Sequence, residues 1–101
     1  MFRNKVKFLI YKTLTNFNKT KDLHVTQKYI INKYKLQEND FGFILEECIN
    51  NHFLDGVISS KSMNNHFSTI YKDYIYITYN GCEFVKNYYS YVRFKENNKK
   101  K

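Results

Sequence analysis

The sequence predicts an α+β domain in which three helices, a small β-hairpin and a closing helix follow one another along 101 residues. Three observations support this prediction. Apolar residues recur at steps of three and four in the N-terminal half and near the C-terminus, which indicates amphipathic helices. Between these segments, residues 67–78 are rich in aromatic and β-branched side chains, as hairpin strands are. The hydrophobic content of 43% and the aromatic content of 19% are typical of a folded chain.

The first two helices are predicted from apolar spacing and from a capping residue. A first helix is expected over Phe2–Lys19, and a polar connection over Asn18–Asp22. A second, short helix is expected to begin near Thr26, whose hydroxyl can accept a hydrogen bond from a free backbone N–H. The residues expected to point inward are Val6, Leu9, Ile10, Thr13, Leu14 and Phe17 on the first helix, and Tyr29, Ile30 and Tyr34 on the second.

A turn anchored by Leu36 leads to the third predicted helix. Asn39 or Asp40 starts it, because either residue is a good N-cap. Gly56 is expected to end it, since glycine tolerates the left-handed turn that closes helices. One side of this helix is predicted to carry Phe41, Leu45, Cys48, Ile49 and His52, and the other side Phe43, Glu46, Glu47 and Asn50.

The β structure is predicted from alternating aromatic or β-branched residues and from a polar loop. Val57–Ser60 is expected to form a short strand, followed by a loop over Lys61–His66. Phe67–Tyr71 and Tyr74–Thr78 then have the pattern of two strands that turn around residues 72–73. This hairpin would project from the helices as a wing.

The closing helix is predicted to start after Thr78, whose hydroxyl can cap it. Its inner side is expected to carry Cys82, Val85, Tyr89 and Val92, with Phe84, Tyr88 and Tyr91 as a second apolar strip. Residues 1–94 are therefore interpreted as one domain, and residues 95–101 as a disordered basic tail.

This order of elements resembles the winged helix-turn-helix fold. The run Phe53-Leu54-Asp55-Gly56-Val57-Ile58, after Leu36, Phe41, Leu45 and Ile49, resembles the usual end of its third helix and the following strand. The run Tyr76-Ile77-Thr78-Tyr79-Asn80-Gly81-Cys82-Glu83-Phe84-Val85 resembles the "Leu-Thr-x-x-Gly-x-x-Tyr-Leu" start of the closing helix in small phage and prophage winged-helix proteins, such as the YjcQ family. The resemblance implies a mobile-element origin, and it transfers no catalytic residues.

The charges of the chain are segregated. Between Leu36 and Ser60 every charged residue is acidic, and these residues are Glu38, Asp40, Glu46, Glu47 and Asp55. The segment carries −5, and because the total is +8, the rest of the chain carries +13. In a winged helix the third helix enters the DNA groove, so carboxylates there would meet phosphates of like charge. Direct base readout by this helix would depend on Asn39, Asn50 and Asn51.

A protein partner is favoured by this charge pattern. The expected docking surface comprises Asp40, Phe43, Glu46, Glu47 and Asn50. The sequence leaves open whether Phe43 is exposed there or is buried under the wing. A large apolar side chain with a polar rim is typical of a protein interface. The partner would be a basic host protein, for example a nucleic-acid-binding defence enzyme that the chain inhibits by occupying its phosphate cleft.

Nucleic-acid binding is the alternative function. A net charge of +8 and an isoelectric point near 9.5 attract polyanions. The chain would then be a winged-helix regulator that contacts phosphates through the first helix, the wing and the tail. The residues expected to make these contacts are Lys5, Lys12, Lys19, Lys61 and Lys72, with the tail lysines 99–101.

Two aromatic strips offer a third kind of contact. They comprise Phe8 and Tyr11 on the first helix and Phe84, Tyr88 and Tyr91 on the last. Mutual burial of the two helices is the simpler expectation, and a homodimer is the alternative.

A metal site is considered at Cys48 and His52, which lie one helical turn apart. Cys82, His24 or His66 would have to complete the ligand set, and core packing explains the pair better. We expect no metal, no cofactor and no enzymatic activity, because nucleophile motifs, phosphate loops and paired acid and base carboxylates are missing from the sequence. With no leader-like or membrane-spanning run, a cytoplasmic location is expected.

Overall fold

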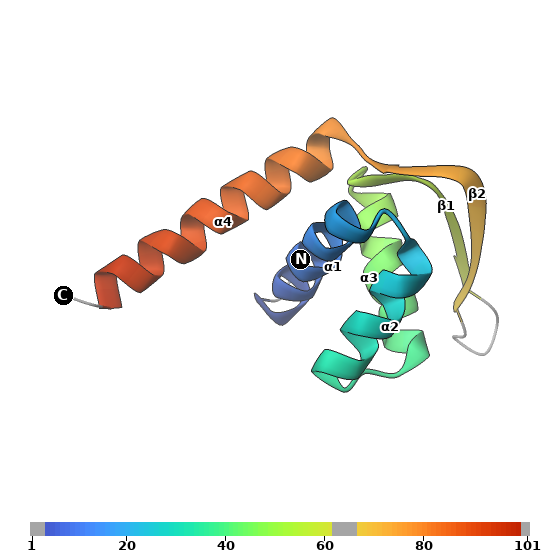
Figure 1. Cartoon of the computed structure of the whole chain (residues 1–101), viewed down its shortest axis with the longest axis horizontal. Coiled ribbons are helices and arrows are strands. Elements are labelled where there is room, and N and C mark those ends of the chain that lie inside the picture. The colour runs from blue at the N-terminus through green and yellow to red at the C-terminus, as the bar shows by residue number, and fades with distance from the viewer. Residues whose placement is uncertain (1–3, 62–66, 100–101) are drawn as a thin grey trace.

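The computed structural model describes the backbone of residues 4–61 and 67–99, and the side chains of residues 5–57, 74–91 and 93. In chain order the elements are α1 (Asn4–Thr20), α2 (Leu23–Tyr34), α3 (Glu38–Asn50), β1 (Leu54–Lys61), β2 (Phe67–Ile77) and α4 (Tyr79–Lys99). The two strands pair antiparallel into one hairpin (Figure 1). The described part of the chain is therefore α+β, with helices before and after a hairpin, as the sequence predicts.

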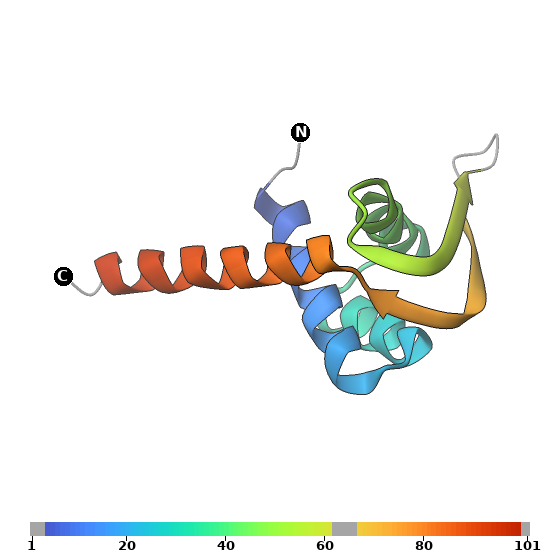
Figure 2. The ribbon, with the colours of Figure 1, turned by 90° about the horizontal axis from the view of Figure 1, so that it is seen from above.

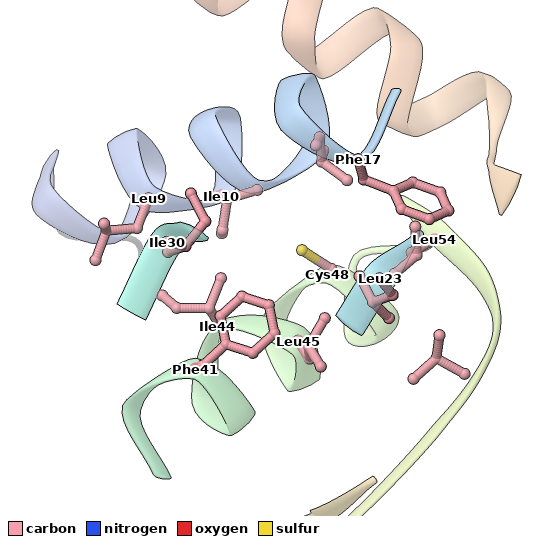
Figure 3. Close-up of a cluster of buried hydrophobic side chains, with 12 residues drawn as sticks. Leu9, Ile10, Phe17, Leu23, Ile30, Phe41, Ile44, Leu45, Cys48 and Leu54 are labelled. Carbon is pink, nitrogen blue, oxygen red and sulfur yellow. The ribbon is translucent and has the colours of Figure 1, made fainter. Parts of the chain in front are cut away.

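The core lies where α1, α2 and α3 meet the start of the hairpin (Figure 3). Its fully or nearly fully buried apolar residues are Leu9, Ile10, Leu14, Phe17, Leu23, Ile30, Phe41, Ile44, Leu45, Cys48, Leu54 and Val57. Burial of each large side chain contributes roughly 1.5–3 kcal/mol. The inward face predicted for α1 is confirmed. The core also fixes the rotation of α3, so the opposite face of that helix points outward.

The connection between α1 and α2 is shorter than predicted, and the predicted cap of α2 is wrong. The first helix runs on to Thr20, which leaves only Lys21 and Asp22 between the helices. Asp22 is the N-cap, and its carboxylate accepts the backbone N–H groups of residues 24 and 25 at 3.0 and 3.3 Å. Thr26 lies one turn inside α2, where it is fully buried and donates to the side chain of Asn16 at 2.8 Å.

The ends of α3 also differ from the prediction. The helix starts at Glu38, and Asp40 stabilises this end by accepting the backbone N–H of Gln37 at 2.9 Å. The helix ends at Asn50, well before Gly56. His52 then takes the left-handed conformation, with φ of 59°, and is exposed. It was predicted to lie on the inner face, and it does not because the helix has already ended.

The hairpin is built from β1 and β2, not from two halves of residues 67–78. The first strand begins at Leu54, earlier than predicted, and β2 is continuous from Phe67 to Ile77. Residues 72–73 therefore do not form the predicted turn. The loop expected over Lys61–His66 lies largely outside the described residues.

Gly56 lies within β1, at a bulge in the pairing of the hairpin. Asp55 pairs with Tyr76, but Val57 pairs with Tyr71. Between these two pairs β1 has one residue, Gly56, whereas β2 has four, so β2 contains three extra residues here. Such a bulge bends a strand, and both strands curve strongly in Figures 1 and 2. Gly56 has φ of 88°, and a Cβ atom there would overlap the backbone carbonyl of Tyr74. The strand needs glycine at this site.

The start of α4 is confirmed, because Thr78 caps it. Its hydroxyl accepts the backbone N–H of Gly81 at 3.1 Å and donates to the carbonyl oxygen of His52. These bonds connect the end of the hairpin, the loop after α3 and the first turn of α4. They fix the direction in which α4 leaves the domain.

The inner face of α4 is not the one predicted. Cys82 is exposed and Tyr89 is half exposed, whereas Val85 packs at the edge of the core. Phe84 stacks on Phe53 with ring centroids 4.7 Å apart, so the strip predicted to be secondary faces the domain. The side chain of residue 92 lies outside the described part.

The helix α4 extends far beyond the domain. It continues to Lys99, so residues 95–99 are helical instead of part of a disordered tail. Figures 1 and 2 show it leaving the body of the protein as an arm, with the first part of the helix beside α1. The overall dimensions of 49 × 26 × 25 Å reflect this extension.

Candidate interaction surfaces

The outward face of α3 presents one continuous row of side chains. Asn39, Phe43, Glu46 and Asn50 follow one another at steps of four, three and four, so they share a helix face. We call this row the α3 stripe. The opposite face holds the buried core residues of α3. Phe43 is 42% exposed at the middle of the stripe, which answers the question that the sequence left open.

The α3 stripe and its neighbours are acidic. Of the five residues predicted to form a docking surface, Phe43, Glu46 and Asn50 lie on the stripe, Glu47 is beside it, and Asp40 is exposed at the start of the helix. The helix contains no Lys or Arg. Among the residues that the structure describes, Glu46 and Glu47 form no ion pair. Their charge is therefore not neutralised within this part of the chain.

Asp55, the fifth acidic residue of the segment, has a different role. It lies on β1, and its carboxylate accepts the hydroxyl of Tyr76 across the hairpin at 2.8 Å. This hydrogen bond, together with the negative charge of Asp55, raises the pKa of Tyr76. Asp55 therefore stabilises the hairpin and does not extend the α3 stripe.

The predicted basic ridge lies along α1. Lys5 and Lys19 are exposed, while Lys12 is partly buried, with its ammonium group 5.6 Å from the ring centre of Phe8 and 5.8 Å from that of Tyr11. Residues 61 and 72 lie on the two strands, but their side chains are outside the described part. Lysines 100–101 are outside it as well.

A tyrosine and a lysine on α2 extend this ridge. Tyr29 was predicted to point inward, but it is 41% exposed. Lys33 donates to its hydroxyl oxygen at 2.9 Å and lies 5.4 Å from its ring centre. This hydrogen bond lowers the pKa of Tyr29, and the charges of Lys33, Lys12 and Lys19 lower it further. We call Lys12, Lys19, Tyr29 and Lys33 the α1–α2 basic face.

Sequence reasoning missed this face because Tyr29 is next to Ile30, and either residue can fill an inward position. The signal that marks the outward face is the spacing of Val25, Tyr29 and Lys33, each one turn apart. All three are exposed.

The residues predicted for a dimer make aromatic contacts within the chain. Phe8 packs edge-on against Tyr34 with ring centres 5.6 Å apart, and Tyr11 packs against Tyr88 at 4.9 Å. Phe84 and Tyr88 lie 5.9 Å apart along α4, and Tyr91 continues the row at 6.2 Å from Tyr88. Tyr91 is half exposed on the arm. The homodimer stays a prediction.

The two cysteines occupy different environments. Cys48 is fully buried, and this burial, with a smaller effect of the charge of Glu47, raises the pKa of its thiol to about 12. Cys82 is exposed. Cys48 is buried in the core whereas His52 is exposed, so these two residues do not form a common metal site. Within the described ranges, no three His, Cys, Asp or Glu side chains form a group that could hold a metal ion, and His66 lies outside these ranges.

A hollow of about 430 Å³ lies where the α1–α2 connection, the end of β2 and the start of α4 meet. Phe17, Leu23 and Ile77 contribute apolar walls. The ammonium group of Lys21, which also lines the hollow, donates to the side chain of Asn18 at 3.0 Å. Among its described lining residues there is no carboxylate or imidazole that could act as a general base.

Comparisons of the chain with models of known protein families, with curated proteins and with solved structures find no match. Over the described residues, no helix is both long enough and apolar enough to cross a bilayer.

Proposed function

We propose that this chain is a small winged-helix module that works by macromolecular contact, and that the α3 stripe docks on a basic surface of another protein. The order of α2, a short turn and α3, followed by a hairpin and α4, supports the winged-helix assignment. In this assignment α3 occupies the place of the recognition helix, and the β1–β2 hairpin is the wing.

The observation that carries the proposal is the exposure of Phe43 in the middle of an acidic helix face. A partly exposed aromatic side chain with a polar rim is the usual form of a protein-binding hot spot. A nucleic-acid reader would instead need Arg, Lys, Asn or Gln along this face. Asn39 and Asn50 are at the two ends of the stripe, but Glu46 lies between them. Close approach of like charges costs several kcal/mol, so insertion into a DNA groove is disfavoured.

The charge of the α3 stripe defines the chemistry of the partner. Glu46 and Glu47 require cationic groups opposite them, and Phe43 requires an apolar pocket. Proteins that bind nucleic acid offer such cations in their phosphate clefts. The resemblance to small phage winged-helix proteins makes a host nucleic-acid-binding defence enzyme the natural candidate, with this chain as an inhibitor that occupies the cleft.

Capture of partners from a host lysate with matched variants tests this proposal. Glu46→Lys and Phe43→Ala change the stripe, while Glu83→Lys on α4 makes the same charge change at another partly buried carboxylate. We expect wild type and Glu83→Lys to retain a protein that both stripe variants lose. Circular dichroism confirms that each variant folds. If the stripe variants capture the same proteins as wild type, in the same amounts, the α3 stripe is not the docking surface.

A further inference from the structure

The α1–α2 basic face, with its three lysines and the exposed Tyr29, takes no part in the proposed docking through α3. We propose that this face binds the phosphodiester backbone of a nucleic acid. The proposal is independent of the α3 stripe, since it depends on other helices and on charge of the opposite sign. It also differs from the ridge predicted from sequence, because it places the contact at Tyr29 and Lys33 of α2.

Tyr29 and Lys33 form a preorganised donor pair. The ammonium group of Lys33 donates one hydrogen to the hydroxyl oxygen of Tyr29 at 2.9 Å and lies against two rings, 5.4 Å from the centre of Tyr29 and 5.9 Å from that of Tyr34. An ammonium group has three hydrogens, so two remain for an anion. The hydroxyl of Tyr29 also keeps its own hydrogen to donate. Because Lys33 is already held in place, it loses less conformational freedom when it binds a phosphate.

Two lysines of α1 add charge to the same place. The ammonium group of Lys12 lies 5.6 Å from the ring centre of Phe8, and Phe8 packs on Tyr34, whose ring centre is 5.9 Å from the ammonium group of Lys33. The charges of Lys12 and Lys19 also lower the pKa of the Tyr29 hydroxyl. Among the residues that the structure describes, the charges that lower the pKa of Tyr29 all belong to lysines. Asp22, the nearest carboxylate along α2 in sequence, accepts backbone N–H groups as the helix cap. A phosphate that approaches Tyr29 therefore meets the ammonium group of Lys33 within the positive field of Lys12 and Lys19.

The exposed apolar surface beside these cations favours a nucleic acid over a small anion. Tyr29 is 41% exposed, and Val25, one turn before it, is 48% exposed. Aromatic side chains between lysines are the usual contacts to sugars and bases in proteins that bind single strands. A chain with +13 outside its acidic segment also attracts a polyanion at long range.

Fluorescence anisotropy with two labelled probes tests the proposal. The probes are a 20-nucleotide oligothymidylate and a 20-base-pair duplex, titrated with the full chain in 50 and 200 mM salt. Three phosphate contacts predict an affinity loss of roughly 20-fold for the single strand, or roughly 40-fold for the duplex, between these salt concentrations. The ratio of the two affinities shows which form is bound.

Matched charge variants locate the contact. Lys33 and Lys86 are both exposed, but only Lys33 is on the α1–α2 basic face. We expect Lys33→Glu to weaken binding by about tenfold or more and Lys86→Glu by about twofold or less, with roughly threefold for the gentler change Lys33→Gln. Absence of binding to both probes at 50 mM salt would overturn the proposal. Equal effects of Lys33→Glu and Lys86→Glu would overturn it too, because they would indicate diffuse attraction only.

Discussion

The hydroxyl of Thr26 on α2 donates a 2.8 Å hydrogen bond to the side chain of Asn16 on α1. Thr26 is fully buried, and its hydroxyl also lies 3.1 Å from that of Thr20. A buried polar group with partners rigidifies the contact between two helices. This bond therefore sets how α2 lies on α1, and with it the position of Tyr29 beside the lysines of α1.

Replacement of Thr26 by Val is expected to destabilise the protein by about 1–3 kcal/mol. The substitution keeps the branched shape but leaves the side-chain oxygen of Asn16 without its donor, and an unsatisfied polar group in a partly buried site is costly. Urea unfolding measures the change as a lower midpoint at constant slope. A midpoint equal to that of wild type would show that the bond does not stabilise the fold.

Thr13 provides the matched control on α1. It is also buried, but its hydroxyl has no hydrogen-bond partner among the described residues. Thr13→Val removes a polar group whose burial is uncompensated, so we expect it to stabilise the protein by about 0.5–1 kcal/mol. The same urea titration should move the midpoint upward. A destabilisation as large as that of Thr26→Val would mean that the Thr13 hydroxyl has a partner after all.

Gly56→Ala is expected to destabilise the protein by about 2 kcal/mol or more. The new Cβ atom would lie 2.9 Å from the Cα atom of Ile75, and alanine disfavours the φ of 88° that the bulge requires. Thermal unfolding detects the loss. Ser90→Ala on the exposed side of α4 is the control and should change stability by about 0.5 kcal/mol or less. A fully stable Gly56→Ala variant would contradict the described bulge.

The thiol of Cys48 predicts a pH dependence. Its pKa is about 12 in the folded protein and near 9.0 when unperturbed. Above pH 9 the unfolded chain releases this proton while the folded chain keeps it, so the free energy of unfolding should fall as the pH rises from about 9 towards 12. Cys48→Ala lacks this contribution, and the difference between the two pH profiles isolates it from other titrating groups. Parallel profiles would contradict the assignment.

Reactivity of the two cysteines gives a second readout of the same burial. At pH 8 a thiol reagent should modify exposed Cys82 in the folded protein and leave Cys48 unmodified. Both should react after denaturation. Rapid modification of two thiols in the folded state would show that the core opens at Cys48.

The sequence predicted the parts of the fold in which apolar and polar residues separate clearly. On α1 the inward residues recur at steps of three and four with polar residues between them, and the buried face agrees with the prediction. On α3 the prediction is right for Phe41, Leu45 and Cys48, but it omitted the buried Ile44 and included His52, which is exposed. The pattern placed Phe43 on the face opposite the core, but only the structure shows that this side chain is exposed. Thr78 was predictable as a cap because its spacing to Gly81 matches a local hydrogen bond.

Other elements were mispredicted because local patterns have more than one structural meaning. A glycine after a helical pattern usually closes the helix, but here His52 closes it and Gly56 belongs to a bulge. The polar residues 72–73 resemble a turn, although the bulge accommodates them within β2. On α4 aromatic side chains occur on several faces, so periodicity could not choose between Tyr89 and Tyr88 as the inner residue.

The most direct test of the account is an amide chemical-shift titration of the isotope-labelled chain with two ligands of opposite charge. An octa-arginine peptide should shift the amides of Phe43, Glu46 and Asn50, because α3 carries the acidic face. The oligothymidylate should shift those of Tyr29 and Lys33 and leave α3 unchanged. If the oligonucleotide instead shifts the α3 amides most strongly, or if the peptide leaves them unmoved, α3 is not an acidic protein-docking helix.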